Sequence, residues 1–344
     1  MTRIYLIRHA EAEGNVFRRA HGQSDGLVTN IGYGQIEKLK ERFIDVHIDK
    51  VYSSDLTRAM ETSAAITEPH GLALETTPML REVDMGVWEL MAWGDIAVDY
   101  PEMSAYFSTD PAHWVVEGAE SYDGVVSRMV EFITQVAQRH DGETIALFSH
   151  GFAIRVFFCR IMGVASHEWH SIPYCDNTAV ALLLYEDGKF SIEYQSDNSH
   201  LRRGEEAIVR QRTYFAENLR YMKLDTERDA GLLGAFSSEF GALPSADIGY
   251  AAYIADEPVG LVGVDVKGDC CEVKYMFLKP ERRRHNFGVQ LLGTAATAAR
   301  EAERDILRIT SPQGSGVSEF CLRHGFHIVS ESGGGVVLEK SIRS

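Results

Sequence analysis

Two histidines and two arginines of this chain stand shortly after apolar runs that predict β-strands. They are Arg8 and His9 after residues 3–7, Arg58 after residues 50–52, and His150 after residues 145–148. Ligand sites in open α/β sheets form at the carboxyl ends of the strands. We therefore expect these four side chains to meet in one pocket.

These residue types suit the transfer of a phosphoryl group. Such a group carries two negative charges and spreads more charge over its oxygens during transfer, which two bidentate guanidiniums and a protonated imidazole would stabilise. The remaining imidazole can be the nucleophile and form a phosphohistidine, which divides one difficult step into two easier ones. The substrate class that this chemistry indicates is a phosphomonoester.

The three segments resemble those of the histidine phosphatase superfamily, also called phosphoglycerate-mutase-like, over about residues 1–200. The family's Arg-His-Gly motif reads Arg8-His9-Ala10 here, one small residue replacing another. The resemblance implies that His9 is the nucleophile and that Arg8, Arg58 and His150 are the catalytic groups around it. It also implies that the Asn15 amide donates a hydrogen bond to a phosphate oxygen, and that this reaction requires no metal.

A general acid is also needed, because an alkoxide must be protonated as it leaves. In the resembling family a glutamate that follows a leucine supplies this proton. The segment Leu80-Arg81-Glu82 fits the phosphatase form of that motif, with Gly86 and Trp88 downstream, and it points to Glu82. Asp84 and Glu89 are the nearby competitors.

The segment expected to cap the pocket, residues 82–127, contains ten acidic residues and neither Lys nor Arg. Phosphoglycerate mutases need extra cations there to hold the carboxylate of a strongly anionic substrate. The composition therefore favours a phosphatase, with a mutase-type phosphotransferase as the alternative. Six aromatic residues of this region could contact the organic part of the substrate or form the core of a lid: Trp88, Trp93, Tyr100, Tyr106, Phe107 and Trp114.

Charge divides the 344-residue chain near residue 200. Residues 1–200 hold 15 Lys and Arg against 30 Asp and Glu, and the remainder holds 19 against 20. We expect a domain over 1–200, a linker over 201–209 and a second domain over 210–344. The acidic half argues against nucleic acid as a partner.

Neither a signal peptide nor a membrane span is expected. The five cysteines have no metal-like spacing, which predicts free buried thiols in the cytoplasm.

Alternating strand and helix patterns predict two α/β domains, the first a layered, mostly parallel sheet of histidine phosphatase type. In the first domain we expect a third strand at 72–74, helices over about 31–43, 121–140 and 152–162, and a hairpin of 179–184 with 190–194. Asp55 is expected to cap a helix that ends near residue 67. In the second we expect a strand at 218–224, a helix over 226–240, a hairpin over 250–264 and a strand over 271–278.

A basic loop between this last strand and a helix carries the second set of candidate residues. Backbone N–H groups at a helix N-terminus bind pyrophosphate, and arginines add charge. The loop resembles motif A of the GNAT acetyltransferases, Arg/Gln-x-x-Gly-x-Gly/Ala, as Arg283-x-x-Asn286-x-Gly288. Asn replaces the first Gly and is the next best residue for a left-handed turn. The resemblance covers about 210–344 and implies acetyl-CoA bound by Leu278, Arg283, Arg284, Asn286 and Gly288.

The acetyl acceptor implied by this resemblance is an amine whose identity the sequence does not indicate. Cys321 stands where a tyrosine general acid often stands in the family, and Glu272 is a possible base by its position in the strand. An alternative is therefore a phosphatase regulated by a catalytically inactive, acetyl-CoA-sensing second domain. The sequence does not indicate an oligomeric state.

Overall fold

The computed structural model describes residues 1–202 and 217–343, which group into two compact units. The first unit holds residues 1–12 and 21–89 and the described part of 99–210. The second holds residues 13–20 and 90–98 and the described part of 211–344. Two short segments of the acidic half therefore belong to the second unit. Most of the expected linker, residues 203–209, lies outside the described residues.

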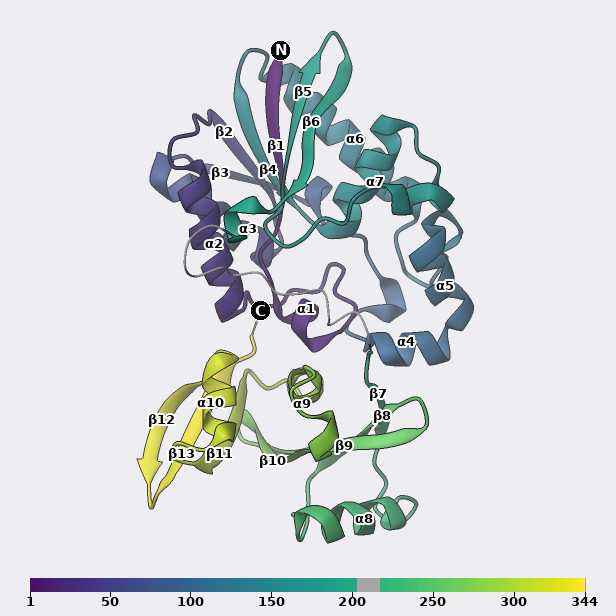
Figure 1. Ribbon diagram of the computed structural model, residues 1–344, viewed down its shortest axis with the longest axis vertical. Helices are drawn as coiled ribbons and strands as arrows, with labels where there is room; N and C mark the ends of the chain where they lie inside the picture. The colour runs from purple at the N-terminus through teal and green to yellow at the C-terminus, as the bar shows by residue number, and fades with distance from the viewer. Residues whose placement is uncertain (203–216, 344) are drawn as a thin grey trace. The chain divides into compact units, whose positions relative to one another are not determined.

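The first unit is built on a six-stranded sheet in the order β3-β2-β4-β1-β5-β6 (Figure 1). Its strands are β1 (Thr2–Arg8), β2 (Lys50–Ser54), β3 (Leu74–Thr77), β4 (Thr144–Ser149), β5 (Val180–Glu186) and β6 (Lys189–Asp197). The first four in spatial order are parallel, and β5 and β6 are antiparallel. The mostly parallel sheet is as expected, although β3 begins where the predicted strand ends.

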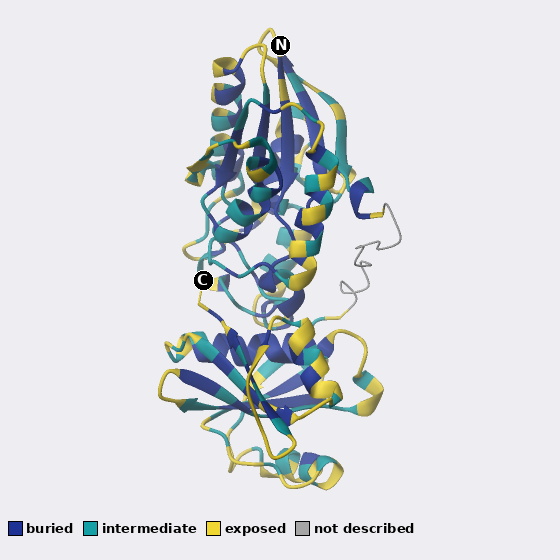
Figure 2. Cartoon of the chain, turned by 90° about the vertical axis from the view of Figure 1, so that its left-hand side faces the viewer, coloured by how far each residue is buried: buried dark blue, intermediate teal, exposed yellow. Residues whose placement is uncertain are grey.

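Helices cover both faces of this sheet. α2 (Asn30–Phe43) and α3 (Thr57–His70) lie on one side, and α6 (Tyr122–Arg139) and α7 (Gly151–Met162) lie on the other (Figure 1). Their apolar faces pack on strands that are buried along their length (Figure 2). The Thr29 hydroxyl caps α2. The expected cap of α3 by Asp55 is absent from the structure, because the carboxylate of Asp55 forms an ion pair with Arg81.

Shorter elements complete the described part of the first unit. They are α5 (Pro101–Thr109) and the 3-10 helices Pro78–Leu80, Gly86–Trp88, Pro111–His113, Ser166–Ser171 and Ser199–Arg202. Between the first two 3-10 helices the chain has no regular secondary structure apart from one isolated bridge at Met85. This irregular segment carries Glu82.

The second unit is built on a seven-stranded sheet in the order β12-β13-β11-β10-β9-β8-β7. Its strands are β7 (Arg220–Lys223), β8 (Ile248–Ile254), β9 (Glu257–Lys267), β10 (Cys270–Leu278), β11 (Ile306–Pro312), β12 (His327–Ser332) and β13 (Gly335–Ser341). Among the described strands of this sheet, only β10 and β11 are paired in parallel, from Cys270–Val273 to Ile306–Ile309. Beyond this ladder, among residues 217–343, β10 pairs only with β9 and β11 only with β13, so the two central strands separate.

Helices also cover both faces of the second sheet. α9 (Phe287–Glu301) packs on one apolar core, and α8 (Ala230–Phe240) packs on a smaller one around Phe236 and Tyr275. The described part of the unit also holds α10 (Gly316–Arg323) and the 3-10 helix Pro280–Arg282. Two elements from earlier in the chain, α1 (Glu13–Phe17) and most of α4 (Trp93–Asp99), belong to it as well. The expected strand at 218–224 and helix at 226–240 are present but shorter. No helix within the described ranges combines the length and hydrophobicity that a bilayer crossing requires.

Candidate functional site

The first unit brings together the histidines that follow two adjacent strands. Arg8 at the end of β1 is in register with Ser149 at the end of β4, and the next residues are His9 and His150. Their ring centroids lie 5.0 Å apart, and both side chains are buried. Arg58 lies in the first turn of α3, and its charge lowers the pKa of both imidazoles, which shows that it is close to them. The expected convergence of these four residues is therefore seen.

His9 is held as a neutral imidazole with a defined tautomer. Its Nδ1 lies 2.7 Å from the carbonyl oxygen of Ala10, which can only accept a hydrogen bond, so the proton is on Nδ1. Burial, with the nearby charges of Arg58 and Arg8, holds the pKa of His9 well below its usual value. Nε2 therefore keeps its lone pair, as a nucleophile requires.

Backbone carbonyls orient the two arginines. Arg8 Nη1 donates to Cys175 O at 2.5 Å, and Arg58 donates to Ser24 O at 3.0 Å and Gly22 O at 2.6 Å. In the part of the chain that the structure describes, no carboxylate forms an ion pair with Arg58. Its burial lowers the pKa of the guanidinium to about 10. A buried cation in this state favours an incoming anion.

His150 is also neutral in this structure, and the protonated imidazole expected around a transferring phosphoryl group stays a prediction. Burial and the charge of Arg58 lower the pKa of His150 well below its usual value. Neither ring nitrogen has a hydrogen-bond partner among the described residues. Since buried polar atoms are nearly always satisfied, two such nitrogens indicate the place of a polar ligand.

The carboxylate of Glu82 reaches the same helix end as His150. His150 is the N-cap of α7, and Glu82 accepts hydrogen bonds from Phe152 N and Ala153 N, each at 3.0 Å. This contact places Glu82 beside the histidine pair.

The two competing carboxylates are engaged elsewhere. Asp84 accepts from Gly86 N at 2.8 Å. Glu89 accepts from Gly22 N, Gln23 N and Ser24 N at 2.8–3.2 Å, and from the Ser24 hydroxyl at 2.6 Å. Glu89 thus organises the loop whose carbonyl oxygens hold Arg58. A Cβ at position 22 would lie 2.3 Å from Glu89 Oε1, so only glycine fits there.

Three residues near the pocket were missed in the sequence. The Tyr174 hydroxyl lies 3.3 Å from Arg8 Nη1, Asn177 Nδ2 donates to the His9 carbonyl at 3.0 Å, and the charge of His21 acts on His9. Tyr174 and Asn177 precede β5, which runs antiparallel to β1. Residues before such a strand lie at the same sheet edge as residues after β1. A prediction that β5 runs antiparallel to β1 would have placed Tyr174 and Asn177 near His9.

The aromatic residues of the capping segment form mainly a packed core. Trp88 and Trp114 are almost fully buried, with ring centroids 5.6 Å apart, and Phe107 stacks on Phe152 at 5.4 Å. Of the two readings of these residues, the structure favours the lid core. Asn15 lies on α1, in the second unit, so its expected contact with a phosphate oxygen stays a prediction.

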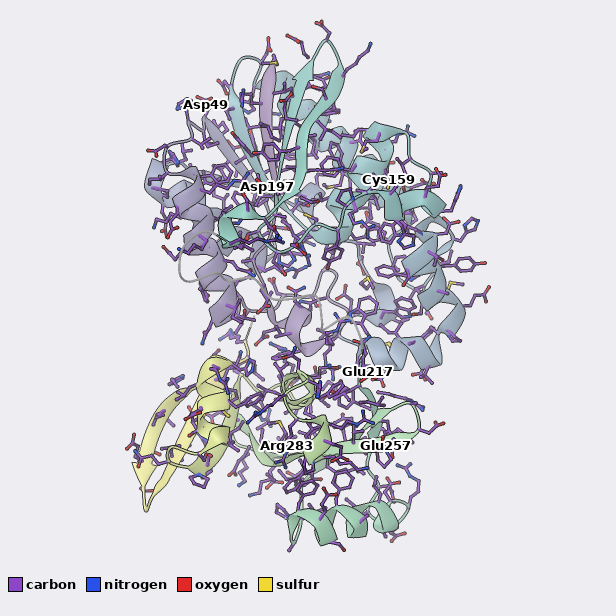
Figure 3. All side chains as sticks on the ribbon, in the orientation of Figure 1. Asp49, Cys159, Asp197, Glu217, Glu257 and Arg283 are labelled. Atoms are coloured by element: carbon purple, nitrogen blue, oxygen red, sulfur yellow. The ribbon has the colours of Figure 1, made fainter. Side chains whose placement is uncertain are left out.

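The second candidate site is the loop from the end of β10 to α9 (Figure 3, where Arg283 is labelled). Asn286 has the left-handed conformation expected for the first Gly of the motif, with φ +62°, and it is the N-cap of α9. Its side chain makes no capping hydrogen bond to the described residues. A Cβ at Gly288 would meet only the Phe320 ring, at 3.5 Å. Arg283 Nε donates to the Leu278 carbonyl at 3.1 Å, and Arg284 has φ +65°.

Two other candidate residues of the second unit do not suit proton transfer. Cys321 is fully buried in the core beneath α9, and desolvation raises the pKa of its thiol to about 12. Glu272 forms ion pairs with Lys267 and Lys274, and the hydrogen bond from Lys267 lowers the pKa of its carboxyl group. Among the described residues, no group of three or more His, Cys, Asp or Glu side chains could hold a metal ion.

Comparison with protein families identifies both halves of the chain. Residues 4–198 match the histidine phosphatase superfamily (branch 1), and residues 212–326 match the acetyltransferase (GNAT) family. Both matches agree with the resemblances drawn from the motifs.

Individual relatives match the first half. Phosphoserine phosphatase 1 of Hydrogenobacter thermophilus is 29% identical over 201 residues, which are 58% of this chain and 95% of that protein. A probable phosphoglycerate mutase GpmB of Yersinia pestis is 27% identical over 206 residues, 58% of this chain and 95% of its own. The solved structure of Bacillus stearothermophilus YhfR is similar with a TM-score of 0.57 and 27% identity, covering 58% of this chain and 99% of that one.

Proposed function

The chain belongs to the histidine phosphatase superfamily and carries a GNAT domain, and from this premise we propose that its first unit hydrolyses phosphomonoesters through a phosphohistidine at His9. The observation that carries the proposal is the neutral His9, with Nε2 unprotonated, facing a neutral His150 whose two nitrogens have no partner among the described residues.

In the first step, His9 Nε2 attacks phosphorus and the bond to the ester oxygen breaks. Arg8, Arg58 and an N–H of His150 stabilise the charge on the transferring oxygens. The departing alkoxide takes a proton from Glu82 and leaves as an alcohol. In the second step, water attacks the phosphohistidine, Glu82 takes the proton of that water, and inorganic phosphate leaves while His9 returns to its starting state.

The capping segment restricts the leaving group. Because residues 82–127 hold ten acidic residues and no Lys or Arg, we infer a neutral or cationic alcohol. A mutase-type transfer between two hydroxyl groups is the second candidate, and the similarity to a probable phosphoglycerate mutase favours it. Release of inorganic phosphate, in amounts equal to the alcohol formed, separates hydrolysis from transfer.

The experiment that tests the proposal traps the intermediate. The full chain is mixed with a ³²P-labelled phosphomonoester and quenched in base, where phosphohistidine survives, and the label should be lost on acid treatment. His9→Ala should carry no label, and Arg139→Ala, an exposed residue on α6, should carry it as the native chain does. Label that persists in His9→Ala would refute the assignment. The full chain is used because residues 13–20 and 90–98 belong to the second unit.

We propose further that the second unit binds acetyl-CoA and transfers its acetyl group to an amine. The residues present fit the cofactor: Asn286 supplies the left-handed turn, Gly288 leaves the first turn of α9 open, and Arg283 and Arg284 add charge. The separation of β10 from β11 beyond Val273 leaves the Leu278 end of β10 with no paired strand on that side in the part of the chain that the structure describes. When bound, acetyl-CoA supplies an activated acyl group.

Saturable binding of acetyl-CoA to the full chain, abolished by Gly288→Glu, tests this second proposal. No calorimetric signal at millimolar acetyl-CoA would refute it. Binding without transfer to any amine would favour the acetyl-CoA-sensing alternative, which the burial of Cys321 and the ion pairs of Glu272 support.

Five free, buried cysteines support a reducing compartment, the cytoplasm.

A further inference from the structure

Arg128, on α6, directs its whole guanidinium toward the segment that carries Glu82. Nε and Nη2 form a bidentate pair with the Glu120 carboxylate at 2.7 and 2.9 Å. Nη1 donates to Met79 O at 3.0 Å and to Arg81 O at 2.6 Å, and Nη2 donates to Glu82 O at 3.0 Å. The side chain is only 13% exposed, so water competes little with these bonds.

These contacts replace the hydrogen bonds that secondary structure would otherwise supply. Residues 81–84 belong to no helix or strand, so their carbonyls need partners from elsewhere. One planar guanidinium binds two of these carbonyls, those of Arg81 and Glu82, and also that of Met79 in the preceding 3-10 helix. A lysine ammonium cannot reproduce this fixed geometry. Glu120 adds a further bond, since its backbone N–H donates to Asp84 O at 3.0 Å. The pair therefore holds the segment on both sides of Glu82.

The carboxylate of Glu82 is fixed independently at its other end. Phe152 N and Ala153 N, at the start of α7, hold its two oxygens. The backbone of Glu82 is thus tied to α6 and its side chain to α7, and these two helices pack against each other. Neither Arg128 nor Glu120 is among the groups placed around the phosphoryl group.

We propose that Arg128 and Glu120 are a positioning pair that sets Glu82 at the distance needed for proton donation to the leaving group. The inference rests on the proposed role of Glu82 as general acid. It predicts that removing the Arg128–Glu120 pair has the same kinetic effect as removing the general acid Glu82. The variant should fail on poor leaving groups and should keep its activity on good ones.

The experiment compares kcat/KM for glycerol 2-phosphate, an alkyl ester, with kcat/KM for p-nitrophenyl phosphate. For each substrate, kcat/KM reflects only the steps up to the departure of the alcohol, so the later hydrolysis of the phosphohistidine does not affect it. Arg128→Met should lose about 10²-fold on the alkyl ester and less than about 5-fold on p-nitrophenyl phosphate, since general acids contribute about 10²- to 10⁴-fold. Glu120→Gln should show the same pattern with a smaller loss, and Arg139→Met, on an exposed position of α6, should match the native chain.

Three further measurements decide the outcome. Equal losses of Arg128→Met on both substrates would overturn the proposal, because a general disruption of the pocket has no leaving-group dependence. In a Glu82→Gln background, Arg128→Met should add no further selective loss, and a full additional loss would also overturn it. If Arg128→Met shows no cooperative thermal unfolding and so is not folded, Arg128→Lys is tested in its place. Its loss on the alkyl ester relative to p-nitrophenyl phosphate should lie between that of the native chain and that of Glu82→Gln. A Glu82→Gln chain that itself lacks leaving-group dependence would refute the general acid and the pair together.

Discussion

The pocket around His9 and the loop around Arg283 are both candidate anion sites, but they are built in opposite ways. The first uses buried side chains, and burial lowers the pKa values of His9, His150 and Arg58. The second uses backbone conformation, with Asn286 in a left-handed turn and Arg283 in an exposed loop. In the first site, the catalytic side chains are already desolvated and oriented in the folded protein before the substrate binds. We therefore expect single substitutions to have large effects in the first site and smaller ones in the second.

The largest effect expected of an arginine is at Arg58. Arg58→Ala removes a buried, oriented cation and should lower kcat/KM by about 10²- to 10³-fold, the scale of one donor to a developing oxyanion. Steady-state kinetics with p-nitrophenyl phosphate measures this loss, with Arg139→Ala as the control. A loss below about 10-fold would mean that the buried site is not more sensitive than an exposed one, where a single charge contributes at most about 1 kcal/mol.

A smaller loss is expected at Glu89, which acts on Arg58 through the loop at residues 22–24. Glu89→Ala leaves four backbone N–H groups, those of residues 22–24 and of Met85, and the Ser24 hydroxyl without their acceptor. It should lower kcat/KM by about 10-fold. The loss should be the same for alkyl and aryl phosphates, unlike that of Arg128→Met. A loss that grows with the pKa of the leaving group would instead return Glu89 to the role of general acid.

Anion binding should take up a proton at the buried site only. The pKa of His150 lies well below its usual value, because the ring is buried. The ring is therefore neutral near pH 7, and a bound dianion favours its charged form. Sulfate should therefore bind more tightly as the pH falls, by up to about 10-fold per pH unit for one proton. Calorimetry in buffers of different ionisation heat measures the uptake, and His150→Gln should abolish it. Uptake that persists in His150→Gln would assign the proton to His9.

The smallest effect expected is at Asn286, where conformation is the determining property. Asn286→Ala places a side chain without local hydrogen bonding at φ +62° and should lower the free energy of unfolding by about 1 kcal/mol. Asn286→Gly should be neutral or slightly stabilising. Chemical denaturation measures both. If Ala and Gly proved equally stable there, the left-handed turn would not be the reason for Asn at this position.

The residues that could be predicted from the sequence are those whose type alone restricts their role. Arg8, His9 and His150 follow apolar strands, and strand order in a parallel sheet brings their positions to one edge. Asn286 could be predicted for a similar reason, because few residue types accept a left-handed turn. The protonated His150 could not be judged in the same way, because its charge depends on the burial of the whole pocket and on Arg58.

Contacts between residues distant in the sequence were not predictable. The family motif points to Glu82 among the three carboxylates of one short segment. The partners that hold Glu82, Asp84 and Glu89, from residues 152–153, 86 and 22–24, could not be derived from the sequence. Arg128 stands on an amphipathic helix at a position that would suit a solvent-facing residue. Asp55 shows the opposite error, since the local capping pattern was outweighed by a bidentate pair with Arg81.

The position of β13 has a practical consequence for trimming this protein. The match to the acetyltransferase family ends at residue 326, yet β13 lies between β12 and β11 and pairs with β11 at seven positions, from Ile306–Ser341 to Pro312–Gly335. A chain shortened at the family boundary would lose this strand and the buried Val336 and Leu338. It would also expose the unsatisfied edge of β11, the kind of surface on which aggregation begins.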